Sequence, residues 1–219
     1  MNDIPFRTRV KFCGLTRPGD VRLAGELGVD AIGFVFVKDS PRRLEVPQAH
    51  WLRAAVPPMV AVVALFMDAD ADYVRYVVEE LRPAMLQFHG SEDEAYCRGF
   101  GVPYLRTIPM RDPHTDPGEM AGRFPSASAF LFDGHALGEM GGSGTRFDLA
   151  ALPGVVRRPG MIAGGLTPDN VFDVVHDARP WGVDVSSGIE SAPGVKDGAR
   201  MRHFMREVRR ADCTQASDD

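Results

Sequence analysis

The sequence predicts an α/β fold, a (β/α)8 TIM barrel formed as a single domain. Eight short apolar runs recur along the 219 residues, and helix signals lie between most of them. Alternating strands and helices imply a parallel sheet with right-handed crossovers. Eight units of about 27 residues fit one closed barrel better than an open doubly wound sheet, which is the alternative fold.

The apolar runs define the predicted strands. Continuous runs of this kind are typical of parallel strands that are buried on both faces. The expected strands are Val10–Cys13, Ala31–Phe36, Met59–Phe66, Met85–Phe88, Tyr104–Ile108, Ala129–Phe132, Met161–Ala163 and Gly182–Val185.

Helix signals occupy most of the intervals between these strands. Thr16 is the expected N-cap of the first helix, because Pro18 follows in the first turn. The expected helices are Arg17–Leu27, Gln48–Ala55, Ala71–Leu81, Glu92–Phe100, a poor one near Asp148–Leu152, Asn170–His176 and Lys196–Arg210.

Other segments are expected to be irregular. Pro109–Pro125 holds four prolines, so it should form a loop with a short helix at most. The glycine-rich segment Gly134–Arg146 is long enough to act as a lid. The barrel should therefore occupy residues 1–210, followed by a disordered polar tail over 211–219.

Composition restricts the partners and the compartment. A formal net charge of −5 argues against nucleic acid or an acidic membrane as the main partner. No apolar run reaches the roughly 18 residues of a membrane span. The first residues lack the order of a secretory signal, and three widely spaced cysteines suit the cytoplasm. Neither metal-ligand spacing nor a dinucleotide or Walker motif occurs, so no metal or cofactor is expected.

Two late loops have the character of phosphate-binding turns. Gly164 and Gly165 follow the seventh predicted strand, and Ser186-Ser187-Gly188 follows the eighth. Glycines allow close backbone approach, and the N–H groups at a helix start attract anions. A (β/α)8 barrel commonly holds a phosphate after strands seven and eight, so these loops predict a phosphorylated small-molecule substrate.

Candidate catalytic groups stand at the ends of other strands. Active sites of these barrels lie at the carboxyl ends of the strands. Cys13 ends the first strand, His89 follows the fourth, and Asp133 follows the sixth. A thiol and a carboxyl group on either side of a phosphate-binding mouth could act as base and acid. His89 is a substrate-binding candidate, although a structural role at its strand end is the more ordinary interpretation.

The order of several motifs resembles the phosphoribosylanthranilate isomerase family, from about Val10 to Phe204. The matching segments are Val10–Thr16, Gly33–Phe36 with Ser40-Pro41-Arg42, Leu86–Gly90, Phe132-Asp133 with Gly141–Asp148, Ala163–Val171 and Val183–Glu190. Each motif is moderately specific, and six in the same order are very specific.

The resemblance implies an Amadori rearrangement in tryptophan biosynthesis that needs no cofactor. The substrate would be N-(5-phosphoribosyl)anthranilate, and the product 1-(2-carboxyphenylamino)-1-deoxyribulose 5-phosphate. By the family's pattern Asp133 is the acid, Cys13 the base, and Arg42 the partner of the anthranilate carboxylate. Arg43 stands where the family more often has an aromatic residue, so either arginine could bind the carboxylate. The implied substrate-binding residues of the last two loops are Gly164, Gly165, Asp184, Ser186, Ser187 and Gly188.

Both catalytic groups need their protonation changed by the surroundings. A free carboxyl group is mostly ionised at pH 7, and a free thiol is mostly protonated. Lys11 lies two residues before Cys13, so both side chains point to the same side of the first strand. Because the first and eighth strands meet where a barrel closes, we expect Lys11 to lie inside the barrel and pair with Asp184.

Two alternative functions remain at this stage. One is another phosphosugar isomerase or epimerase, although an epimerase would need several metal-binding histidines and only His89 is suitably placed. The other is a non-catalytic barrel that binds a phosphosugar. The oligomeric state is left as monomer or homodimer.

Overall fold

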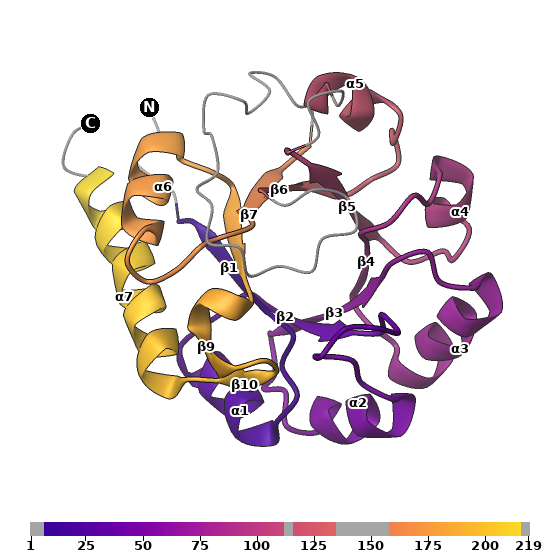
Figure 1. The fold of residues 1–219 in the computed structure, drawn as a ribbon, viewed down its shortest axis with the longest axis horizontal. Coiled ribbons are helices and arrows are strands. Elements are labelled where there is room, and N and C mark those ends of the chain that lie inside the picture. The colour runs from indigo at the N-terminus through magenta and orange to yellow at the C-terminus, as the bar shows by residue number, and fades with distance from the viewer. Residues whose placement is uncertain (1–6, 112–115, 135–157, 216–219) are drawn as a thin grey trace.

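A computed structural model describes residues 7–111, 116–134 and 158–215. Within these ranges eight parallel strands close into a barrel in chain order. Figure 1 shows the strands as a central ring with the helices around it. The strands are β1 (Arg9–Cys13), β2 (Ala31–Val35), β3 (Ala61–Phe66), β4 (Met85–Phe88), β5 (Tyr104–Pro109), β6 (Ala129–Asp133), β7 (Gly160–Ala163) and β8 (Gly182–Val185). The predicted (β/α)8 barrel is confirmed.

The helices of the described ranges cover the outside of the barrel. They are α1 (Pro18–Glu26), α2 (Val46–Arg53), α3 (Ala71–Leu81), α4 (Glu94–Arg98), α5 (Pro117–Gly122), α6 (Val171–Ala178) and α7 (Gly198–Gln215). α5 is the short helix that the proline-rich segment allowed. The helix expected near Asp148–Leu152 lies outside the described residues, as does the expected lid from residue 135 onward. None of the described helices combines the length and apolar character needed to cross a membrane.

The start of the first helix differs from the prediction. Arg17 is the N-cap of α1, and Pro18 takes the first helical position. The Thr16 hydroxyl instead donates a hydrogen bond to the carbonyl of Gly194, almost at the other end of the chain. The expectation that Thr16 caps the helix was therefore wrong, because its side chain is directed to this long-range partner and Arg17 occupies the N-cap position.

The last helix begins and ends later than predicted. Lys196 belongs to a small hairpin of β9 (Glu190–Ala192) and β10 (Val195–Lys196), and Asp197 caps α7 at its start. The helix continues through Ala211, which is fully buried and extends the apolar stripe of Phe204 and Val208. The expected end at Arg210 was therefore too early, and residues 216–219 lie outside the described ranges.

Side chains along each strand point alternately outward and inward, and the two sets pack in separate cores. Side chains that point outward from the strands pack with the helices in one large cluster. Those pointing inward fill the barrel in two smaller clusters, one of which contains Cys13, Val35 and Leu65. Inward-pointing polar residues lie in the same interior, including Lys11 and Gln87, each 1% exposed. The barrel interior is thus apolar at one level and charged beneath Cys13.

Candidate active site

One pocket opens at the carboxyl ends of the strands. Its lining includes nine of the eleven residues singled out from the sequence, namely Cys13, Arg42, His89, Asp133, Gly164, Gly165, Asp184, Ser186 and Ser187. Of the other two, Lys11 contacts Asp184 of this lining, and Gly188 directly follows Ser187. The structure therefore brings together residues from the first, fourth, sixth, seventh and eighth strands and from the loop after β2.

Lys11 and Asp184 form a buried ion pair inside the barrel. The Lys11 ammonium donates to Asp184 Oδ1 at 2.9 Å, and the two side chains are 1% and 8% exposed. The pair arises because β1 and β8 are adjacent and place Lys11 directly opposite Asp184. This contact is the one expected from the strand period and the closure of the barrel.

Cys13 lies directly above this ion pair. Burial raises the pKa of the Cys13 thiol, while the positive charges of Lys11 and Lys196 act in the opposite direction. Gly33 on the neighbouring strand makes the close packing possible. A Cβ at Gly33 would lie 2.7 Å from the Cys13 sulfur and 3.2 Å from the Lys11 nitrogen. The role of Gly33 was not predicted from the sequence, because a glycine inside a strand carries no chemical signal of its own.

Asp133 ends β6 and is 8% exposed. Gly164 lies against it with φ +82°, and a Cβ there would lie 2.4 Å from both Asp133 Oδ1 and the Gly134 nitrogen. The first glycine of the loop therefore serves two purposes: it turns the chain and leaves room for the candidate acid.

His89 reaches the same pocket from β4. Its Nε2 lies 3.6 Å from Asp133 Oδ2, and its Nδ1 lies 3.3 Å from the Thr107 hydroxyl. Burial lowers the pKa of His89, so the neutral imidazole is favoured at pH 7. A neutral ring beside Asp133 can orient that carboxyl group within the pocket.

The two adjacent arginines have different surroundings. Arg42 lines the pocket, and its Nε and Nη2 donate to the two oxygens of Glu190 at 2.8 and 2.7 Å. Arg43 instead pairs with Glu45 at 2.9 Å and does not line the pocket. The geometry therefore favours Arg42 for contact with a bound anion.

The two phosphate-type loops pack against each other. Gly164 and Gly165 both have positive φ, and Asn170 braces the turn by accepting from the Thr167 nitrogen and donating to the Gly165 carbonyl. A Cβ at Gly188 would lie 1.9 Å from the Leu166 carbonyl oxygen, so only glycine fits where the loops touch. Ser186 begins a short helical turn over Ser187–Ile189, as expected of a phosphate site in this fold.

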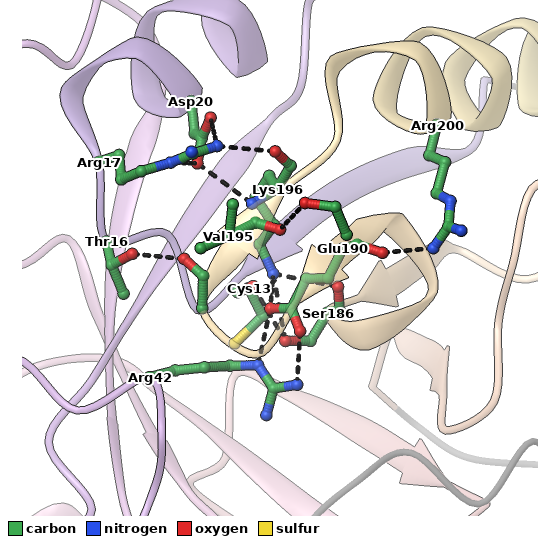
Figure 2. A network of polar contacts seen from close by, with 12 residues as sticks. Cys13, Thr16, Arg17, Asp20, Arg42, Ser186, Glu190, Val195, Lys196 and Arg200 are labelled. Atoms are coloured by element: carbon green, nitrogen blue, oxygen red, sulfur yellow. Dashed lines mark hydrogen bonds and ion pairs between the residues drawn. The ribbon is translucent and has the colours of Figure 1, made fainter.

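Three polar residues at the site were not identified from the sequence. Glu190 and Lys196 pair at 2.7 Å behind Arg42, as Figure 2 shows. Gln87 lines the pocket, and its Oε1 has no hydrogen-bond partner within the described part of the chain. Glu190 and Gln87 lie inside the motifs that carried the resemblance, which was the signal available for them. Lys196 was taken as the start of a helix.

Comparison with known proteins decides the family. Residues 10–207 match the N-(5'-phosphoribosyl)anthranilate (PRA) isomerase family. The chain belongs to this family. The resemblance that the motifs suggested is thereby confirmed.

Individual PRA isomerases are similar over almost the whole chain. The protein named N-(5'-phosphoribosyl)anthranilate isomerase in Xanthomonas campestris pv. campestris (strain 8004) is 53% identical, over 99% of this chain and 100% of its own. The one in Stenotrophomonas maltophilia (strain K279a) is 55% identical, over 95% and 96%. The crystal structure of the Thermus thermophilus PRA isomerase superposes with a TM-score of 0.82 at 33% identity, covering 93% of this chain and 99% of that one.

A further PRA isomerase structure contains a bound ligand. That enzyme was crystallised with reduced 1-(o-carboxyphenylamino)-1-deoxyribulose 5-phosphate, and it superposes with a TM-score of 0.76 at 28% identity. The superposition covers 92% of this chain and 98% of that one. The fold that carries this ligand in the relative is thus present here.

Proposed function

We propose that this chain catalyses the Amadori rearrangement of N-(5'-phosphoribosyl)anthranilate in tryptophan biosynthesis, with Cys13 as base and Asp133 as acid. The observation that carries the proposal is one pocket lined by Cys13, Asp133 and the two phosphate-type loops. It is supported by membership of the PRA isomerase family.

The reaction needs one acid and one base in sequence. Protonation of the ribose ring oxygen opens the ring to an iminium ion, and this is the task assigned to Asp133. Removal of the C2 proton then gives an enolamine, which becomes the ketone, and this is the task assigned to Cys13. Each group acts by proton transfer, and no step requires a redox or carbonyl-activating cofactor.

The two roles require a protonated Asp133 and an ionised Cys13, and the surroundings of the two groups differ. Asp133 is nearly buried and shares the pocket with Asp184, and its proposed role as acid requires the protonated carboxyl group. Burial works against the thiolate of Cys13, while the Lys11 and Lys196 ammonium groups favour it. The thiol is thus the group whose activation depends most on its charged neighbours.

The two anionic groups of the substrate would be held by different residues of the pocket. The phosphate would lie at the backbone of Gly164, Gly165, Ser187 and Gly188, where glycines permit close approach. Two donors of Arg42 already bind Glu190, which fixes the guanidinium plane and leaves its Nη1 side for the anthranilate carboxylate. Asp184, Ser186 and His89 would complete the polar contacts around the sugar.

The remaining assignments complete the proposal. We place the protein in the cytoplasm, as a single catalytic domain that works as a monomer or homodimer and has a phosphosugar, not nucleic acid or a membrane, as its main partner. The sparse cysteines and the negative formal charge support these points.

The direct test is consumption of freshly made N-(5'-phosphoribosyl)anthranilate, followed by its loss of fluorescence. The wild-type protein should consume it, and Cys13→Ser and Asp133→Ala should be slowed about 10²- to 10⁴-fold, the usual contribution of a general base or acid. Cys213→Ser and Asp72→Ala, two exposed positions away from the pocket, serve as matched controls. A wild-type protein that binds a product analogue without turning over the substrate would instead indicate the non-catalytic barrel.

A further inference from the structure

Lysine is rare in this chain and occurs next to the candidate base. Of the 25 basic residues counted as Lys or Arg, only Lys11, Lys38 and Lys196 are lysines. Two of these three are buried, with side chains 1% and 0% exposed, and both act electrostatically on Cys13. Lys11 pairs with Asp184, whereas the contacts of Lys196 extend beyond its effect on the thiol to Glu190 and Ser186.

The Lys196 ammonium makes three contacts. It donates to Glu190 Oε1 at 2.7 Å and to the Ser186 carbonyl at 3.0 Å, and it lies 3.4 Å from the Ser186 hydroxyl. That hydroxyl in turn donates to the carbonyl of Cys13 at 3.1 Å. Lys196 therefore connects the β9–β10 hairpin to the eighth-strand loop and, through it, to the backbone of the candidate base.

Glu190 connects the same lysine to the candidate carboxylate-binding arginine. One carboxylate oxygen accepts from Lys196 and from Arg42 Nε, and the other accepts from Arg42 Nη2. Figure 2 shows Glu190 between the two cations. The hydrogen bonds of Arg42 and Lys196 overcome burial and hold the pKa of Glu190 below its ordinary value, so the carboxylate is ionised.

The charges in this cluster do not balance. Among the side chains that contact the Glu190 carboxylate, Arg42 and Lys196 supply two positive charges against one negative charge, which leaves a surplus of one. Burial lowers the pKa of the Lys196 ammonium, and the Glu190 carboxylate opposes that shift. The neighbouring pair of Lys11 and Asp184 is neutral. A surplus charge away from water is unfavourable unless an anion comes close. Two candidate anions adjoin the cluster: the thiolate of Cys13 and a carboxylate bound to Arg42.

We propose that Lys196 is a positioning residue for the isomerase reaction, which supplies the surplus positive charge beside Cys13 and, through Glu190, fixes the orientation of Arg42. The proposal rests on the proposed roles of Cys13 and Arg42. The charged groups that act on Cys13 are Lys11 on its own strand, Asp184 on β8, Lys196 on β10 and Arg42 after β2. Among them, Lys196 alone is linked through Glu190 to the anion-binding arginine.

Lys196→Met tests two contributions of Lys196 together: its positive charge beside Cys13 and its support of Arg42 through Glu190. Loss of the cation should raise the pKa of Cys13, measured as the pH dependence of alkylation of the Cys13 peptide by iodoacetamide. The direction of the pKa shift is diagnostic, because a merely loosened site would let in water and lower the raised pKa of a buried thiol. The kcat/KM at pH 7 should fall about tenfold for each unit by which the thiol pKa rises, and KM should also rise because Arg42 loses part of its support.

A double variant separates the two effects. Lys196→Met with Glu190→Gln restores the surplus charge, because one cation and one anion are removed together. The thiol pKa should return toward the wild-type value, while KM stays high because Arg42 has lost its carboxylate partner. Lys196→Gln keeps a donor to Glu190 without the charge and gives the same thiol test if Lys196→Met does not fold. Lys38→Met, an exposed lysine outside the pocket, controls for total charge.

Two results would overturn the proposal. One is a Lys196→Met protein whose thiol titration and KM equal those of the wild type. The other is a double variant whose thiol pKa stays as high as that of Lys196→Met. Thiol titration does not depend on turnover, so failure of the proposed isomerase activity would be seen separately, as an inactive wild-type protein.

Discussion

At the scale of single residues, the site depends on a buried ion pair that stability alone does not explain. Replacing a buried ion pair by well-packed apolar residues is often neutral or stabilising, whereas removing one partner leaves a costly unpaired charge. Lys11 and Asp184 are both nearly inaccessible and are 2.9 Å apart. We propose that their value lies in the effect of the Lys11 ammonium on the pKa of the Cys13 thiol.

Replacing Lys11 by methionine should raise the pKa of the Cys13 thiol and lower kcat/KM. Removal of one partner should also cost about 3 kcal/mol of unfolding free energy, because Asp184 is left buried and unpaired. Adding Asp184→Asn should recover most of that stability but not the activity. Urea unfolding and thiol titration of both variants measure the two effects, and an unchanged thiol titration in Lys11→Met would refute the electrostatic role.

Gly164→Ala should damage the site through a direct collision with Asp133. The new Cβ would lie 2.4 Å from Asp133 Oδ1 at a backbone φ of +82°. Displacing the proposed acid by about 1 Å should lower kcat/KM by about a hundredfold. Gly101→Ala is the matched control, because it has φ +65° with no atom within 4 Å, so it carries the backbone strain alone. Equal activity in the two variants would contradict the expectation.

Whether these residues could be predicted depends on whether a local sequence pattern fixes their positions. Lys11 and Asp184 could be paired from the sequence, because the two-residue strand period and barrel closure fix their positions. Arg42 and Glu190 are 148 residues apart and lie in or beside loops, where no period applies. The strands that contain Glu190 and Lys196 are three and two residues long, too short for an apolar pattern.

At the scale of elements, the strands formed by long apolar runs were predicted well, whereas the ends of two helices were not. Each barrel strand was found within about two residues, because a strand buried on both faces needs an unbroken apolar run. The end of α7 was missed because polar residues surround Ala211, although its own position continues the buried stripe. Tertiary contacts decided that boundary, as they did for Thr16.

The last turns of α7 are tied to the lead-in of the first strand. Asp212 accepts hydrogen bonds from the Thr8 nitrogen at 3.1 Å and the Thr8 hydroxyl at 2.7 Å. Asp212→Ala should therefore lower the unfolding free energy by about 1–2 kcal/mol without changing KM. Glu79→Ala, which removes an exposed carboxylate from α3, should leave stability unchanged. A loss of activity without a loss of stability in Asp212→Ala would contradict a structural role.

At the scale of the whole molecule, barrel closure determines both the site and the pH range of stability. Adjacent β1 and β8 bring residues from the two ends of the chain into one polar network. The same burial that packs the molecule also fixes the protonation of several groups. His89 has a lowered pKa in the folded state, so its contribution to stability is present above the unfolded pKa and is lost as pH falls.

Cys97 should limit stability on the alkaline side. Burial raises the pKa of its thiol from 9.0 to about 12, so the folded state keeps its proton over a range in which the unfolded chain has lost it. A raised folded pKa contributes stability that is complete below pH 9 and disappears as pH rises toward 12. Within that window this one group should increase the unfolding equilibrium constant about tenfold per pH unit. The unfolding free energy, measured by urea unfolding from pH 8 to 10.5, should decline less steeply with pH in Cys97→Ala than in the wild type. Cys213→Ala, at an exposed position on α7, should retain the wild-type slope. Equal slopes for Cys97→Ala and the wild type would mean that the thiol ionises in the folded protein as it does in the unfolded chain.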